Sequence, residues 1–246
     1  MKIEKSERGI ILDYLTSKIK LTQIDGNLYT IKIVDFYDLS DIDQKKFGNF
    51  FKSFCNERKI RIFTNEARPE NIFLKSLNYK IYKSKILYKK TLTEIKPIST
   101  HLIFKPITEI SHEIFIETFT KSLEDYHETD GLNCLEYFNY LKSHAGNTFN
   151  EIEWKVVFHK NEPIGVLFPQ VYSDNVEEGT IFYIGLIPKY RKMGFGRSIH
   201  LEGLNCLYRM GVKTYFGSTL KSNLGMQMLF KFNDCKIEAH QNFFTL

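Results

Sequence analysis

The residues best suited to chemistry lie between positions 186 and 197, after an apolar run and before a stretch with helical spacing. Two glycines there, Gly194 and Gly196, allow the backbone to turn sharply and to approach a ligand closely. The first amides of a helix have no partners within it, and the positive end of the helix dipole lies beside them. Positive charge is added by Arg191, Lys192 and Arg197. The sequence therefore predicts a site for a phosphate or a diphosphate.

This loop matches neither of the two common phosphate-binding loops. A Walker A loop requires the string GxxxxGK followed by Ser or Thr, and the sequence has none. The Rossmann fingerprint requires a third glycine where this chain has Ile199, and an acidic residue near 214–216, where Thr, Tyr and Phe stand. What remains is the string Arg191-x-x-Gly194-x-Gly196. It follows a strand whose end has an apolar residue, then any residue, then a proline.

Strand-like and helical stretches follow one another around this loop and must position it. The nearly all-apolar run 180–187 is typical of a central strand that is covered on both faces. Pro169 lies in another strand-like run and indicates an edge strand or a bulge. The other expected elements are helices over 108–145 with a break near Asp130-Gly131, over 197–210 and over 222–232, strands over 153–160, 164–172 and 213–219, and a closing pair of strands over 235–246. Their order predicts a mixed sheet of the α+β or α/β class.

The first part of the chain differs from the rest in charge. Residues 1–96 hold 20 Lys and Arg against 12 Asp and Glu, whereas residues 97–246 hold 14 against 17. Two of the six prolines lie in 97–106, which we interpret as the boundary between two units. Before it we expect strands over 28–36, 60–63 and 79–90 and helices over 41–59 and 68–77. The succession of strand, helix and strand over 60–90 repeats the one that follows residue 213, which indicates a second, partial copy of the same fold.

The string Arg191-x-x-Gly194-x-Gly196 resembles motif A of the GNAT superfamily of N-acetyltransferases, which has Gln or Arg, two residues, Gly, one residue, and Gly or Ala. Three further segments agree with that family, the last one loosely: Leu186-x-Pro188-x-Tyr190, Ser218-Thr219-x-x-x-Asn223-x-x-Met226, and residues 230–235. The resemblance implies an acyl-CoA N-acyltransferase fold with splayed central strands and a catalytic domain at 97–246. Residues 1–96 would be a partial or degenerate GNAT-like unit, without the motif, that serves packing, dimerisation or acceptor selection.

The resemblance also implies an activity and a co-substrate. The chain would transfer an acetyl group from acetyl-CoA to a primary amine of a small molecule, by direct attack of the amine. The amide of Leu186 would polarise the thioester carbonyl, Ile187 and Pro188 would line the pantetheine arm, and Asn223 would hydrogen-bond it. The residues expected to bind the diphosphate are Arg191, Lys192, Met193, Gly194, Phe195, Gly196, Arg197 and Ser198.

The groups that move protons are not defined by the motifs. Many members of the family use a tyrosine on the last helix to protonate the leaving thiolate, and this chain has Phe230 there. A water molecule or another side chain would replace it, or the thiolate would leave unaided. Glu178 and Tyr183 are the candidate bases, with a solvated turn carboxylate as the alternative for Glu178. The chain has a second candidate function, that of a catalytically silent module that binds acyl-CoA for regulation.

Two groups of residues bear on the acceptor. Glu124, Asp125, His127, Glu128 and Asp130 surround Tyr126, and this rim would suit a cationic amine, although a solvated helix end explains it as well. Helical spacing places most of the neighbouring aromatic residues in the core, with an acceptor pocket as the alternative. These residues are Phe115, Phe119, Tyr126, Tyr137, Phe138 and Tyr140.

Several classes of protein are excluded by the sequence. The cysteines, at 55, 134, 206 and 235, form no CxxC pair, and the histidines show no metal-ligand spacing, so we expect reduced thiols and no metal. There is no apolar run of about 18 residues and no signal-like N-terminus, which predicts a cytoplasmic protein that does not enter a membrane. The sequence contains no nucleic-acid recognition motif, and it leaves a homodimer open.

Overall fold

The computed structural model describes residues 2–6, 9–14, 17–25, 27–34, 40–98, 101–126 and 131–246. The chain folds into two compact units. The N-terminal unit comprises Met1–Leu87, Ser218–Ser222 and Ile237–Leu246, and the C-terminal unit comprises Tyr88–Gly217 and Asn223–Lys236. Because the end of the chain belongs to the N-terminal unit, the two units interleave in the sequence, whereas we expected one boundary near 97–106. The assignment of the catalytic domain to 97–246 stays a prediction.

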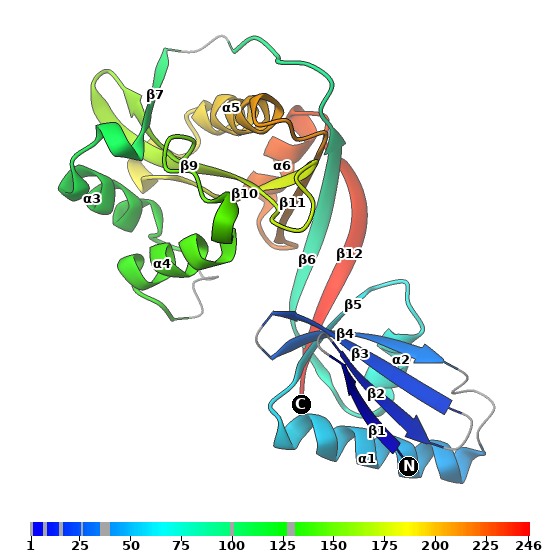
Figure 1. Cartoon of the computed structure of the whole chain (residues 1–246). Helices are drawn as coiled ribbons and strands as arrows, with labels where there is room; N and C mark the ends of the chain where they lie inside the picture. The colour runs from blue at the N-terminus through cyan, green and yellow to red at the C-terminus, as the bar shows by residue number, and fades with distance from the viewer. Residues whose placement is uncertain are drawn as a thin grey trace. The chain divides into compact units, whose positions relative to one another are not determined.

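The sheet of the N-terminal unit begins with an antiparallel meander of β1 (Lys2–Ser6), β2 (Gly9–Tyr14), β3 (Ser17–Asp25) and β4 (Leu28–Val34) (Figure 1). Parallel to β4 lies β5 (Arg61–Asn65), which pairs antiparallel with β12 (Lys236–Thr245), and β6 (Lys80–Thr91) follows in the strand order. The sequence predicted β4, β5 and β6 but missed the first three strands. The predicted pair of closing strands over 235–246 is wrong, because that stretch forms the single strand β12.

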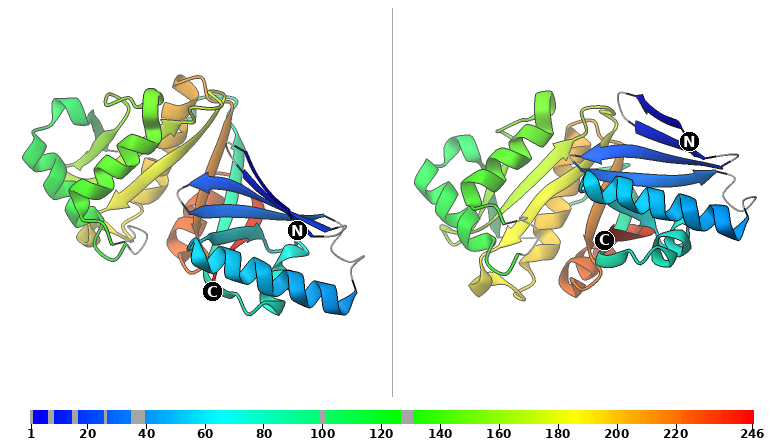
Figure 2. Two further views of the ribbon diagram at one scale, coloured as in Figure 1. Left: turned by 60° about the horizontal axis from the view of Figure 1, so that its bottom comes forward. Right: turned by 90° about the horizontal axis from the view of Figure 1, so that it is seen from below.

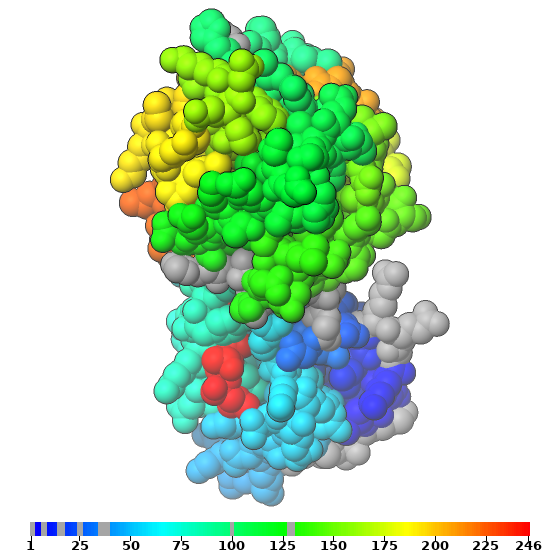
Figure 3. Space-filling view, turned by 90° about the vertical axis from the view of Figure 1, so that its left-hand side faces the viewer, coloured from blue at the N-terminus to red at the C-terminus, as the bar shows by residue number. Residues whose placement is uncertain are grey.

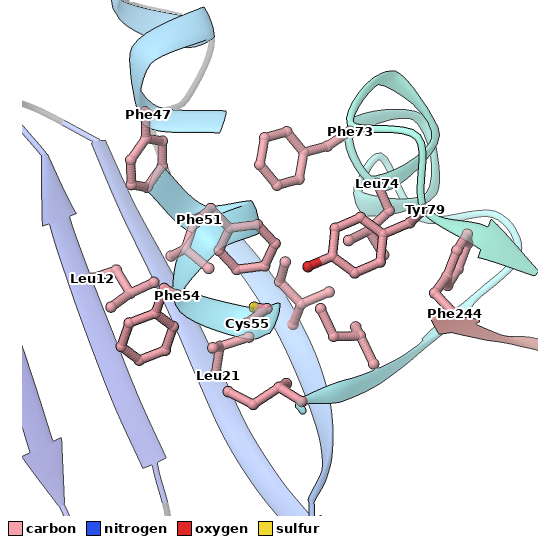
Figure 4. Close-up of a cluster of buried hydrophobic side chains, with 14 residues drawn as sticks. Leu12, Leu21, Phe47, Phe51, Phe54, Cys55, Phe73, Leu74, Tyr79 and Phe244 are labelled. Carbon is pink, nitrogen blue, oxygen red and sulfur yellow. The ribbon is translucent and has the colours of Figure 1, made fainter. Parts of the chain in front are cut away.

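A long helix covers one face of this meander. Helix α1 (Asp41–Glu57) lies along the strands, as both views of Figure 2 show, and the shorter α2 (Glu70–Ser76) packs beside it. The predicted phenylalanine spacing points the α1 side chains into the core, where the ring of Phe51 lies 5.5 Å from that of Phe73 and 6.2 Å from that of Tyr79. Figure 4 shows this cluster closed from the strand side by Leu12 and Leu21. The N-terminal unit thus has a hydrophobic core of its own.

The C-terminal unit contains a sheet with the strand order β6-β11-β10-β9-β8-β7. Its strands are β7 (Leu102–Pro106), β8 (Lys155–His159), β9 (Glu162–Val171), β10 (Glu178–Leu186) and β11 (Thr214–Leu220). Strand β7 pairs antiparallel with β8, so the stretch that we interpreted as a boundary forms a strand in its second half. Strand β9 has neighbours on both sides, and Pro169 lies opposite Ile181, where the register of β10 shifts. Of the two interpretations of Pro169, the bulge is therefore confirmed and the edge strand is wrong.

Helices cover both faces of this sheet. One face carries α3 (His112–Ser122) and α4 (Cys134–Ala145), which form the green surface of Figure 3. On the other face, α5 (Phe195–Arg209) packs on β9 and β10 and contacts α6 (Leu224–Phe232). Successive residues of β9 face opposite sides, so that Phe168 packs under α3 while Leu167 packs against Ile199 of α5. Of the predicted aromatic core, the sheet-facing residues Phe115, Phe119 and Tyr137 are buried, Tyr126 and Phe138 are partly buried, and Tyr140 is exposed.

The two central strands of the C-terminal unit part soon after they meet. Strands β10 and β11 pair in parallel only at Glu178–Thr214 and Gly179–Tyr215. From Thr180 onward, β10 therefore has no ladder partner on its β11 side, which is the splay expected from the resemblance. The N-terminal unit repeats the succession, since β4, α1, β5, α2 and β6 correspond in order to β10, α5, β11, α6 and β12.

Candidate active site

At the carboxyl end of β10, the backbone groups of Leu186 face the gap between β10 and β11. The amide of Ile187 donates to the carbonyl of Ile164 on β9, with an N···O distance of 2.9 Å. Because the backbone groups of successive residues in an antiparallel strand point to opposite sides, the N–H and C=O of Leu186 point away from β9, toward the gap. The carbonyl accepts a hydrogen bond from Nε of Arg191 at 2.9 Å. The N–H of Leu186 is thus placed to donate to a ligand in the splay.

The loop after β10 turns sharply twice before α5 begins. A single 3₁₀ turn spans Pro188–Tyr190, and both Lys192 (φ 62°) and Gly194 (φ 87°) adopt left-handed conformations. A residue with a side chain pays about 1–2 kcal/mol in this region, whereas glycine adopts it freely. Gly194 caps α5 but has no side chain with which to bind the first amides. In the part of the chain that the structure describes, the amides of Phe195, Gly196 and Arg197 have no acceptor.

Helix α5 differs in this respect from four other helices of the chain. Side-chain oxygens bind the first-turn amides of α1, α3, α4 and α6, and these oxygens belong to Ser40, Ser111, Asn133 and Asn223. The first turn of α5 contains no acidic residue, and Lys192 and Arg197 beside it are exposed. The guanidinium of Arg197 lies 5.5 Å from the ring centroid of Phe232 on α6. Free amides, the helix dipole and two cations therefore meet at one point, as an anion site requires.

The corresponding helix of the N-terminal unit, α1, does not form such a site. Its cap, Ser40, accepts a hydrogen bond from the amide of Asp43, and the first turn carries Asp41 and Asp43. Two carboxylates would repel a diphosphate, and one of the amides is already bound. Residues 35–39, which precede this helix, lie outside the described part of the chain. Of the two equivalent helices, α5 is the one whose N-terminus suits an anion.

The side chain of Arg191 does not face the α5 amides, although we expected it to add charge to the anion site. Its Nη2 donates to the carbonyls of Glu124 at 2.6 Å and Ser122 at 3.3 Å, and its Nη1 lies 3.2 Å from Oδ2 of Asp125. With the bond to Leu186, the guanidinium links the end of β10 to the turn that follows α3. This arrangement could not be predicted from the residue types, since three of the acceptors are backbone carbonyls.

The backbone groups of Ile187 and Pro188, which we expected to line the pantetheine arm, are engaged in hydrogen bonds within the chain, and their lining role stays a prediction. The amide of Ile187 is bound to β9, and its carbonyl accepts from the amide of Tyr190 at 2.9 Å. The carbonyl of Pro188 accepts from the amide of Arg191 at 3.0 Å. These groups stabilise the loop itself, so the free edge of β10 ends at Leu186.

Asn223 has a structural role that the motif did not predict. Its Oδ1 accepts a hydrogen bond from the amide of Met226 at 3.0 Å and so caps α6. The side chain is exposed, and its Nδ2 is the group that can donate to a ligand. Met193 is exposed as well, whereas Phe195 and Ser198 are half-buried.

The two candidate bases, Glu178 and Tyr183, lie at the start and in the middle of β10. Glu178 begins β10 and Leu186 ends it, and a nine-residue strand at about 3.3 Å per residue spans roughly 26 Å. Tyr183 is only 4% exposed, and its hydroxyl donates to the carbonyl of Ser122 at 2.8 Å. Burial raises the pKa of Tyr183 above its ordinary value. Glu178 thus lies far along β10 from Leu186, and the hydroxyl of Tyr183 is bound in the core, so neither arrangement favours a base and both roles stay predictions.

The surroundings of Phe230 are apolar and closely packed. Phe230 is 1% exposed, stacks on Tyr88 with 4.2 Å between the ring centroids, and meets His200 edge-on at 5.3 Å. Both ring nitrogens of His200 are engaged, Nε2 with the hydroxyl of Tyr215 at 3.2 Å and Nδ1 with Nδ2 of Asn233 at 2.8 Å. Burial, reinforced by the charge of Lys90, lowers the pKa of His200 to about 3. His200 therefore packs in the interior of the C-terminal unit.

The acidic rim is described only in part. Asp125 pairs with Arg191, and Glu124 is exposed, while His127, Glu128 and Asp130 lie outside the described residues. The four cysteines are free, and burial raises the pKa of Cys55, Cys206 and Cys235 to about 12. The described residues include no cluster of three or more His, Cys, Asp or Glu that could hold a metal ion. None of the helices described is long and apolar enough to cross a membrane.

The chain is similar to known proteins in structure. No protein-family model and no curated protein sequence matches it. Among solved structures it is similar to a GCN5-related N-acetyltransferase from Sphaerobacter thermophilus, with a TM-score of 0.69 and 10% identity over 97% of this chain and 80% of that one. A tandem GNAT protein from the clavulanic acid biosynthesis pathway gives a TM-score of 0.60 at 9% identity, over 97% and 82% of the two chains. A GNAT-family acetyltransferase from Colwellia psychrerythraea gives 0.56 at 11%, over 97% and 85%.

Proposed function

We propose that this chain, which has the fold of the GCN5-related N-acetyltransferases, binds acetyl-CoA at the N-terminus of α5 and transfers the acetyl group to a primary amine of a small molecule. The observation that carries the proposal is that two sets of N–H groups without acceptors lie at the two ends of one loop. Those of Phe195, Gly196 and Arg197 open α5, and that of Leu186 faces the splay one loop earlier.

Coenzyme A has a shape and chemistry that suit these groups. Its diphosphate would be bound by the amides that begin α5, with Lys192 and Arg197 supplying charge. Its pantetheine arm is an extended amide chain, and the unpaired edge of β10 offers backbone donors and acceptors that a strand would otherwise satisfy. Nδ2 of Asn223 would donate to the same arm. When bound, acetyl-CoA supplies the acetyl group as a thioester.

The residues of the chain would act mainly by binding and orientation. The N–H of Leu186 would donate to the carbonyl oxygen on which negative charge develops. Holding the thioester beside the amine makes the reaction effectively unimolecular, which supplies a large part of the rate. Because Glu178 is distant and Tyr183 is bound, we propose that water takes the proton of the amine. The thiolate would leave unaided, since a free thiol has a pKa of about 8.5.

A second function is favoured by the surroundings of Phe230. The phenyl ring of Phe230 has no proton to give, Glu178 lies far along β10 from Leu186, and the hydroxyl of Tyr183 is bound in the core. These features suit a module that binds acyl-CoA for regulation and does not turn it over. The two functions share the binding site and differ only in chemistry.

The first experiment is a thermal unfolding titration with acetyl-CoA. A ligand at 100 times its Kd stabilises the folded state by about 2.7 kcal/mol, so a clear rise in the melting temperature is expected. No shift at millimolar acetyl-CoA would refute both functions. The second experiment measures release of free CoA with a panel of amines, amino sugars and peptides. Turnover with any acceptor supports the transferase, whereas binding without turnover on the whole panel supports the regulatory module.

A further inference from the structure

We infer that Arg191 is a positioning residue, which holds the turn after α3 against the end of β10 and thereby shapes the side of the site from which the amine approaches. The inference rests on the proposed function. It departs from the role that charge alone suggests for an arginine beside a phosphate-binding loop, because the guanidinium is bound to four other acceptors.

The geometry requires the planar fork of an arginine. Nε donates to Leu186 at the end of β10, while Nη2 donates to Glu124 and Ser122, which are more than 60 residues earlier in the chain. The five N–H donors of a guanidinium lie in one plane and can bridge acceptors on opposite sides. The ammonium group of a lysine concentrates its donors on one nitrogen and cannot reach both sets. One side chain therefore joins two elements that no backbone hydrogen bond connects at this point.

The acceptors lie at the carboxyl end of α3, where a helix leaves its last carbonyls unpaired and its dipole is negative. Arg191 satisfies these carbonyls and complements the dipole. Ser122 also accepts from the hydroxyl of Tyr183, which anchors the same turn to β10 a second time. Asp125 has a left-handed conformation, with φ 64°, that needs support from its surroundings.

The ion pair with Asp125 contributes little to this arrangement. The carboxylate of Asp125 is 80% exposed, and pairs between exposed charges stabilise proteins by about 0–1 kcal/mol. The carbonyl of Glu124, by contrast, accepts from Arg191 at 2.6 Å, and the carbonyl of Ser122 accepts from both Arg191 and Tyr183. The carbonyls therefore account for most of the effect of Arg191, and Asp125 provides the matched control.

The position of this turn bears on the acceptor. A single guanidinium bridges Leu186 and the turn formed by residues 122–125, so the turn borders the point where the thioester carbonyl would be held. The diphosphate enters from the other side, at the start of α5 on the opposite face of the sheet from α3. An amine that attacks the carbonyl would pass beside the turn. Displacing the turn would thus disturb acceptor binding and leave the cofactor site intact.

The experiment compares Arg191→Lys, Arg191→Gln and Asp125→Asn in the full chain. Amide hydrogen exchange is followed at Leu123 and Glu124, whose N–H groups donate to carbonyls in the last turns of α3, and at Tyr126, whose N–H donates to the carbonyl of Leu123. We expect exchange at least tenfold faster in both Arg191 variants and less than threefold faster in Asp125→Asn. The Kd for acetyl-CoA, measured by calorimetry, should change by less than threefold in all three variants. With the best amine of the panel, its KM should rise at least fivefold in the Arg191 variants.

Two results would overturn the inference. One is unchanged exchange at the turn in folded Arg191→Gln, with Arg191→Lys as the second variant should the first not fold. The other is a tenfold loss of acetyl-CoA affinity in Arg191→Gln that Arg191→Lys restores, because that pattern shows a charge acting on the phosphates. Failure of the wild-type chain to bind acetyl-CoA would refute the proposed function alone, since the exchange measurement still decides whether Arg191 holds the turn.

Discussion

A substitution at Gly196 separates the charge of the anion site from its shape. Gly196 lies in the first turn of α5, and a Cβ atom added there would lie 3.1 and 3.2 Å from the two methyl carbons of Leu229. The leucine must therefore move by a few tenths of an ångström in any variant. Gly196→Asp and Gly196→Asn share this steric effect and differ only in charge, so we compare their affinities for acetyl-CoA.

The expected difference follows from the electrostatics of a partly exposed site. Two like charges about 5 Å apart repel by about 3 kcal/mol at an effective dielectric constant of about 20. Gly196 is half-buried, and halving the repulsion for solvent screening leaves about 1.5 kcal/mol, which corresponds to roughly tenfold in Kd. The fold itself should not suffer from the charge, because a carboxylate in the first turn of a helix is stabilising by about 0.3–1 kcal/mol.

Calorimetric titration with acetyl-CoA measures the two dissociation constants, and unfolding curves confirm that both variants are folded. We expect the Asp variant to bind at least tenfold more weakly than the Asn variant, with the gap narrowing as salt is raised. Equal affinities of the two variants would refute the reasoning, because a diphosphate bound by the α5 amides must sense a carboxylate at Gly196.

Three further predictions concern buried or distant groups. His200 has a pKa of about 3 in the folded chain and about 6.5 in the unfolded chain, so the unfolded state takes up the proton first as the pH falls. The free energy of unfolding should therefore fall between pH 7 and pH 4 by about 3 kcal/mol more in the wild type than in His200→Gln. Urea denaturation of both proteins at the two pH values measures this difference. A parallel loss in both proteins contradicts this. Tyr183→Phe removes one buried hydrogen bond and should lower the free energy of unfolding by about 1 kcal/mol with kcat unchanged within twofold; a tenfold lower kcat would restore Tyr183 as a catalytic residue. Glu178→Gln should leave kcat and its pH profile unchanged in the CoA-release assay, and loss of the acidic limb of that profile, which reports a general base, would contradict the distance from Leu186.

The phosphate-binding loop could be predicted because its determinants are local. Gly194, Gly196, the apolar strand before them and the helix after them are neighbours in the sequence, and backbone geometry follows from such neighbours. The splay of β10 and β11 was implied by the resemblance and is present in the register of the two strands. The helices and strands of the C-terminal unit could also be predicted, because their apolar runs are long and bounded by turns.

The features that escaped prediction depend on contacts between distant parts of the sequence. The direction of Arg191 is set by carbonyls of Ser122 and Glu124, which carry no side-chain signature. The separation of Glu178 from Leu186 was also missed, because the two residues stand at opposite ends of the single strand β10. Strands β1 and β2 escaped because they are only five and six residues long, whereas β3 carries the alternation of a strand at Lys18 to Leu21 and was overlooked. The pairing of β12 with β5 is likewise invisible in the local pattern.

The most direct test of the site is the amide spectrum of the ¹⁵N-labelled chain during titration with coenzyme A. We expect the largest chemical-shift changes at the N–H groups of Gly194, Phe195, Gly196 and Arg197, together with that of Leu186, since these groups have no acceptor within the described chain. Large changes confined to other residues, with these five amides unmoved at saturation, would contradict the account.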